Sequence, residues 1–280
     1  MILLLGLGGV LNAEPAKVDA NTPIGRAFVR LYNWDFAGTH AIVDQHAKDD
    51  PADPMAPAVR AAAYMFAELH RLRILELDFF ADDSNVTDRR KLVPDPMLRQ
   101  EFFHAIEHAK QLAEARLAAQ PGDREALFAL CMATGLVTDY AALIERRRFG
   151  SFSLSRQNQV YARKLLALQP PYWDAYLTYG ALEYVVGSMP FFIRWLVRFE
   201  QVEGNKEKAV QNLEKVAERG KYYGPFARIL LSVIHMREKR AAKAESLLAG
   251  LAADFPENPL IKKELARASE MARRQAARRR

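Results

Sequence analysis

The sequence predicts an all-α protein, built as an α-solenoid of about four or five stacked helical hairpins with two irregular insertions. Ala, Leu, Glu, Arg and Lys are plentiful and β-branched runs are scarce, which favours helix. Residues 225–256 read as a helix, a short basic turn and a second helix closed by Pro256. Prolines also follow helical stretches at Pro121 and Pro170, where the second helix of a hairpin should stop. A single hairpin cannot bury its own apolar face, so others must stack against it.

The composition is that of a folded chain with a charged end. The 280 residues are 50% hydrophobic and 26% charged, which excludes a disordered protein. Residues 273–280 hold five arginines and no acid, so the formal charge of +6 falls to +1 without them. We expect this basic tail to be solvated, with contact to anionic lipid as the alternative, and we expect no nucleic-acid partner. Cys131 is the single cysteine of the sequence, so an intrachain disulfide is impossible.

The N-terminus resembles a secretory signal. Residues 2–11 are an apolar run, followed by a polar stretch with a candidate cleavage point near Ala13, and the run is too short to span a bilayer. We therefore expect a signal peptide over residues 1–13, a helical repeat domain over 14–272 and a basic tail over 273–280. The protein is then exported and periplasmic, or cytoplasmic if the run is not a signal.

Helix boundaries in the first half follow from prolines and turn residues. A helical pair is expected around Asn33-Trp34-Asp35, and Pro57 suits the first turn of the next helix, where a missing N–H costs nothing. A polar loop follows, and Gln120-Pro121-Gly122-Asp123 ends a long helix. The expected helices cover residues 26–48 as a pair, 57–80, 97–119 and 124–136.

The second half contains both irregular segments. Residues 140–155 and 186–203 interrupt the repeat pattern, and insertions in repeat proteins map to loops on one face. Between and after them, apolar periodicity predicts further helices; in one of these, Ala209, Leu213 and Val216 point inward. These helices cover residues 156–168, 172–186, 206–219, the hairpin of 225–256, and 258–276.

The hairpin resembles a tetratricopeptide repeat, a helical hairpin of about 34 residues. The small or apolar positions that carry the resemblance are Leu231, Ser232, Ala244, Leu248 and Leu251. Residues 174–265 are similar to one eukaryotic branch, the tetratricopeptide-repeat/inclusion-body-clearance family of mitochondrial outer membranes and lipid droplets. Tyr179-Gly180, Ser188-Met189-Pro190 and Gly204-Asn205-Lys206-Glu207 carry that similarity. It implies an all-helical fold and membrane or aggregate association, and it supplies no catalytic residues.

The expected function is a non-enzymatic scaffold that binds a protein or peptide partner. The first helices of successive hairpins would form a concave surface, with exposed positions at Phe226, Ile229, Val233 and Met236. Tyr176 and Tyr179 are expected to join this surface. Arginine presents a fork of donors to anionic groups, so the cluster Arg146, Arg147 and Arg148 is a further candidate contact. No cofactor or metal is expected.

Two alternatives remain open from the sequence. The apolar helix of residues 191–199, with the basic tail, would suit a membrane-associated assembly factor that makes peripheral contact with lipid. His104, Glu107 and His108 match the H-x-x-E-H pattern of inverted zinc peptidases, in which two histidines one turn apart bind zinc. That reading requires a third ligand, and nothing in the sequence identifies one.

Overall fold

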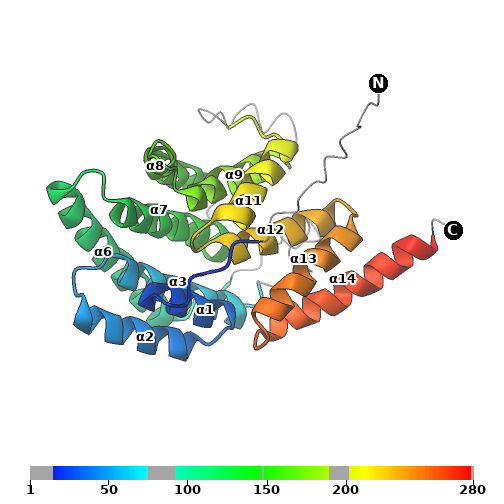
Figure 1. Ribbon diagram of the computed structural model, residues 1–280, viewed down its shortest axis with the longest axis horizontal. Helices are drawn as coiled ribbons and strands as arrows, with labels where there is room; N and C mark the ends of the chain where they lie inside the picture. Colours follow the sequence, from blue (N-terminus) through cyan, green and yellow to red (C-terminus); the bar gives the residue numbers. More distant parts are fainter. Residues whose placement is uncertain (1–14, 75–91, 147, 189–201, 279–280) are drawn as a thin grey trace, which may run out of the picture.

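Eleven α-helices make up the described part of the computed structural model, which covers residues 15–74, 92–146, 148–188 and 202–278 (Figure 1). The helices are α1 (Pro23–Tyr32), α2 (Phe36–Asp49), α3 (Met55–Arg71), α6 (Pro96–Ala119), α7 (Arg124–Asp139), α8 (Arg148–Leu166), α9 (Tyr176–Gly187), α11 (Lys206–Arg219), α12 (Gly224–Arg237), α13 (Ala241–Asp254) and α14 (Pro259–Ala277). Consecutive helices pack against one another in pairs. The prediction of an all-α protein is confirmed.

Local side-chain chemistry explains where the helices begin. Asp95, Asp123, Asn205 and Asn258 each accept backbone N–H bonds at the first turn of the helix that follows. Such caps satisfy donors that have no partner inside the helix. Proline occupies the first or second position of α1, α6, α12 and α14, where its missing N–H is not needed.

The predicted irregular segment of residues 140–155 is shorter in the structure. A π-helical turn, Tyr140–Ile144, extends α7, and α8 already begins at Arg148. The prediction of an irregular stretch is therefore wrong for residues 148–155, which form the first turns of a helix. Glycine and serine in that stretch lower helix propensity without preventing a helix.

The second insertion leaves its hairpin intact. Residues 189–201 lie outside the described residues, but α9 before them and α11 after them pack together. The buried carboxylate of Glu183 on α9 accepts hydrogen bonds from the amides of Glu203 at 3.4 Å and Asn205 at 2.8 Å. Gly187 and Gly204 approach so closely that a Cβ on Gly187 would lie 2.5 Å from the carbonyl oxygen of Gly204. These contacts hold the two ends of the insertion together.

The first helix also contacts residues near the C-terminal helices. The hydroxyl of Tyr32, at the end of α1, donates to the carbonyl of Tyr222 at 3.0 Å. The side-chain amide of Asn258, at the start of α14, donates to the carbonyl of Tyr32 at 2.7 Å. Figure 1 shows the α13–α14 turn beside the N-terminal helices. Units of a solenoid contact only their sequence neighbours, so these contacts do not confirm the predicted solenoid.

A column of aromatic rings runs through the core. Phe28 of α1 stacks on Tyr222 at 4.8 Å between ring centroids, Tyr222 stacks on Phe128 of α7 at 5.7 Å, and Phe128 stacks on Tyr172 at 4.7 Å. Asp174, 1% exposed, accepts three backbone N–H bonds from the turn that carries Tyr222. Helices α1, α7 and the α11–α12 turn therefore share one core.

Among the described residues, one stretch is long and apolar enough to cross a membrane. It is Arg124–Ile144; its most apolar 18-residue window has a mean hydropathy of 1.8, and 61% of that window is buried in the protein. It packs against α3, α6 and α8 at the centre of the fold. A central core helix has the same length and composition.

Candidate functional site

The predicted partner surface on α12 is not exposed. Phe226, Ile229 and Val233 are half-buried and pack against the main core, and Met236 is 7% exposed. The ring of Phe226 lies 6.0 Å from that of Phe66 on α3. The expectation that these four side chains form an exposed concave face is wrong, because three of them pack against the main core and Met236 is buried within it.

The tyrosines of α9 belong to two different apolar clusters. Tyr179 is half-buried against the main core, and burial raises the pKa of its hydroxyl. Tyr176 packs against the smaller cluster beneath α11 and α12, and it stacks on Trp173 at 5.8 Å. Lys215 of α11 places its ammonium 4.4 Å from the Tyr176 ring. Tyr176 therefore borders α11, whereas Tyr179 packs against the main core.

The arginine cluster is only partly described. Arg146 is half-buried in the turn between the π-helical segment and α8, with a left-handed φ of 55°. Arg147 lies outside the described residues, and Arg148 is the first residue of α8. Partner contact by this cluster stays a prediction.

The histidines of the zinc hypothesis are surface residues of α6. His104, Glu107 and His108 are all exposed, and Glu107 pairs with Lys110 at 3.2 Å. Within the described residues, no third His, Cys, Asp or Glu stands beside them in a group able to hold a metal. The geometry gives the zinc hypothesis no support.

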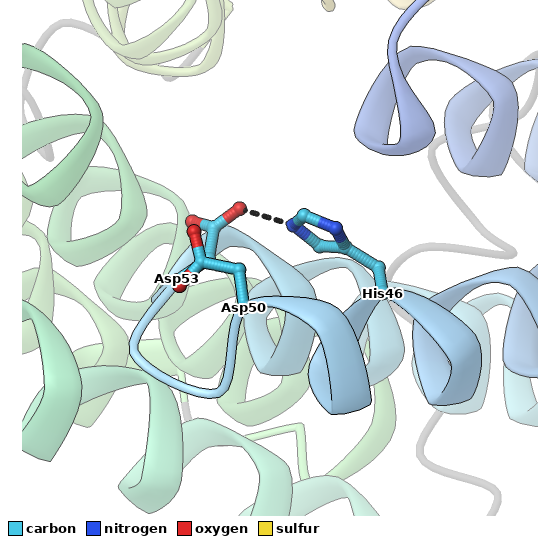
Figure 2. Close-up of side chains that lie close together, drawn as sticks. All are labelled: His46, Asp50 and Asp53. Carbon is cyan, nitrogen blue, oxygen red and sulfur yellow. Dashed lines mark hydrogen bonds and ion pairs between the residues drawn. The ribbon is translucent and has the colours of Figure 1, made fainter.

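His46, Asp50 and Asp53 do come together at the α2–α3 turn (Figure 2). The His46 Nε2 and Asp53 Oδ2 atoms lie 2.7 Å apart, a hydrogen-bond distance, and Asp53 Oδ1 accepts the amide of Met55 at 2.9 Å. Both Asp53 oxygens are thus engaged, and the cation of Arg116 lies 4.0 Å from Asp53 Oδ1. Zinc ligands at about 2.1 Å from a shared ion stand farther apart than 2.7 Å, and a neighbouring cation repels a metal. We interpret this cluster as a set of hydrogen bonds that stabilises the α2–α3 turn.

Two hollows lie on the surface beside α11 and α12, and Pro15 and α13 also border the larger one. The larger hollow has a volume of about 290 Å³. Leu231 and Leu247 belong to its apolar lining, while Glu214 and Glu218 of α11 and Lys243 of α13 are charged groups of the lining. A second hollow of about 270 Å³ continues between α11 and α12, from Val210 and Ile234 to Lys206 and Glu238. We call the two hollows together the α11–α12 groove.

The groove follows most of α11. Its lining runs from Lys206 to Glu218 on that helix, which is about 18 Å at 1.5 Å per residue. That length accommodates about five residues of extended peptide. The Lys206–Glu238 ion pair, at 2.8 Å, joins the two helices at one end of the groove. Together the two hollows therefore border a length of α11 that matches a short peptide segment.

A buried arginine lines the larger hollow. The side chain of Arg228 is 3% exposed, and its Nη2 donates to Asp254 Oδ2 at 2.7 Å. Its Nε has no hydrogen-bond partner among the described residues. Leaving such a donor unmatched costs about 1–3 kcal/mol, and more when the group is charged. A guanidinium in this position therefore favours an additional acceptor.

His235, two turns along the same face of α12, also lines this hollow. It is 6% exposed, and its Nδ1 has no hydrogen-bond partner among the described residues. Burial, followed by the charges of Arg240 and Lys243, lowers the pKa of His235 to about 4. The imidazole is therefore neutral at pH 7 and offers one N–H donor and one acceptor nitrogen.

No protein-family model matches the chain, and no curated protein matches it. The tetratricopeptide pattern thus stays a resemblance. The larger hollow also has a signal in the sequence. Arg228 and His235 stand seven residues apart, which places two polar side chains on one face of a helix that is otherwise largely apolar.

Proposed function

We propose that this protein is a non-enzymatic helical scaffold with tetratricopeptide-like hairpins, and that it binds a peptide segment of a protein partner in the α11–α12 groove. The observation that carries the proposal is the pair of hollows in line along α11, lined by apolar and charged side chains. This groove lies on the opposite side of α12 from the surface that the repeat pattern predicts.

The architecture of the groove supports recognition of a peptide. Leu247, which is half-buried, offers contact to an apolar side chain, while the charged groups at the rim give register and selectivity. A groove built on packed helices requires little rearrangement when a ligand binds, and this reduces the entropic cost of association. An exported location would place the partner in the cell envelope, and this expectation depends on residues 1–13.

Site-specific photo-crosslinking in the native cells tests the proposal. A photoreactive residue replaces Ser246, which is exposed and lines the groove, and a matched variant carries it at Gln45 on the exposed side of α2. We expect Ser246 to capture one protein through one peptide and Gln45 to capture none of that protein. Equal capture from both positions, or no defined adduct from Ser246, would refute a partner site in this groove.

A second candidate function is membrane-associated assembly, and the last turns of α14 favour it. Figure 1 shows α14 extending beyond α13, and Arg273, Arg274 and Arg278 are exposed there. Clustered arginines attract anionic lipid headgroups by about 1 kcal/mol each. The apolar segment of residues 191–199 lies outside the described residues. Flotation with phosphatidylserine vesicles, compared between the full chain and a chain lacking residues 273–280, tests it: equal flotation of the two contradicts a role for the tail.

A further inference from the structure

We infer that the larger hollow of the α11–α12 groove is a carboxylate-binding site, in which Arg228, His235, Lys243 and Ser246 receive one acidic side chain of the bound peptide. The inference rests on the proposed function for the source of the carboxylate. It rests on side-chain chemistry alone for the site itself.

The wall formed by α12 and α13 presents hydrogen-bond donors. The Arg228 guanidinium lines the hollow, and with 3% of its side chain exposed it has one ion-pair partner, Asp254. Its Nε donor is unmatched among the described residues. Arginine has five N–H donors in a planar fork, and the bond to Asp254 uses one of them. A planar carboxylate matches such a fork.

Three further side chains line the same hollow. Lys243 of α13 is exposed and has no ion pair with any residue that the structure describes. The hydroxyl of Ser246, one turn along α13, provides a small donor, and neutral His235 provides another. Two cationic and two neutral groups thus line the place where one oxyanion would sit.

The opposite wall selects between oxyanions. Glu214 and Glu218 of α11 line the hollow as well, so the four charged side chains of its lining sum to zero with His235 neutral, and Asp254, the partner of Arg228, adds one negative charge. Carboxylate ligands carry one negative charge, whereas phosphate carries about 1.5 to 2 at neutral pH. The two glutamates repel the more highly charged group more strongly. They also offer acceptors to the peptide amides that flank the bound acidic residue.

The test uses the full chain and the Arg228 Nε–H resonance in a proton–nitrogen correlation spectrum. Sodium acetate, sodium phosphate and sodium chloride are added separately at constant ionic strength. We expect a saturable shift of this resonance with acetate, weaker saturation with phosphate, and no saturable shift with chloride. Absence of a saturable acetate shift would overturn the inference, and tighter binding of phosphate would overturn the choice of a carboxylate.

Surface variants keep the test independent of folding. Lys243→Gln should weaken acetate binding at least threefold, and Glu218→Gln should strengthen both anions, phosphate more than acetate. Unchanged acetate binding in Lys243→Gln would contradict the assignment. Photo-crosslinking at Ser246 remains a separate result, because a peptide partner can be captured while acetate fails to bind. The failure of this inference is thus distinguishable from the failure of the proposed function.

Discussion

Replacing Asp174 should destabilise the protein more than replacing an exposed carboxylate. One oxygen, Oδ1, accepts the amides of Tyr222 at 2.8 Å and Tyr223 at 2.6 Å, and Oδ2 accepts that of Lys221 at 2.7 Å. In Asp174→Ala the amide of Lys221, an exposed residue, can bond to water instead. The amides of Tyr222 and Tyr223 lose their acceptor inside the protein. Two hydrogen bonds to a charged group at about 1.5–3 kcal/mol each predict a loss of about 3–6 kcal/mol.

Asp174→Asn distinguishes the loss of hydrogen-bond acceptors from the loss of the negative charge. Its amide oxygen can take the place of Oδ1 and keep two of the three bonds, whereas its NH₂ group faces the Lys221 amide, so we expect a loss of about 1–3 kcal/mol. Urea unfolding at neutral pH measures both variants, with Glu114→Ala on the exposed face of α6 as a control within about 0.5 kcal/mol of wild type. If Asn is as damaging as Ala, or if Ala costs less than 1 kcal/mol, the three-bond account is refuted.

Three further predictions concern other parts of the chain. Folding lowers the pKa of His235 from 6.5 to about 4, so the neutral imidazole contributes its full share of the unfolding free energy above about pH 6.5, and this share is lost as the pH falls from there through 4. In His235→Gln, the midpoint of urea unfolding should fall less over this pH range. Gly204 has a φ of 70°, and a methyl group on it would lie 3.0 Å from the Gly187 amide nitrogen, so Gly204→Ala should lower the unfolding free energy by roughly 1–3 kcal/mol. The control Gly122→Ala places its methyl group in open space and should not lower the unfolding free energy. Asn258→Ala should cost about 1–3 kcal/mol and reduce hydrogen-exchange protection in both α1 and α14, whereas Asn258→Asp should keep the α14 cap and lose protection only in α1.

Local signals in the sequence predict most helix boundaries. The expected helix over 206–219 is α11 itself, and the expected helices over 97–119 and 258–276 begin or end within one residue of α6 and α14. In each case an N-cap or a proline stands at the start, and these residues act on the backbone a few positions away. Such signals do not depend on the tertiary fold, so they can be read without it.

The sequence does not predict which neighbouring helices cover each face of α12. Apolar residues occupy more than one side of this helix: Phe226, Ile229 and Val233 pack against the main core, and Leu231 and Ile234 belong to the smaller cluster. Periodicity identifies the faces of a helix but not which neighbour covers each face. The repeat pattern assigned the first face to a partner, whereas α1, α3 and α7 contribute to the core that covers it. The larger hollow lies on the other side of α12, which carries the polar residues Arg228 and His235.

The contacts of Tyr32 with Tyr222 and Asn258 could not be predicted from the sequence either. They affect the position of one wall of the groove. Tyr32 accepts a hydrogen bond from Asn258, just after α13, and donates one to Tyr222, just before α12. One residue of the N-terminal hairpin thus contacts both ends of the α12–α13 hairpin, which forms one wall of the groove. In an open solenoid that wall would depend only on its sequence neighbours. Here its position depends on α1 as well, so contacts from α1 help to fix the position of this wall.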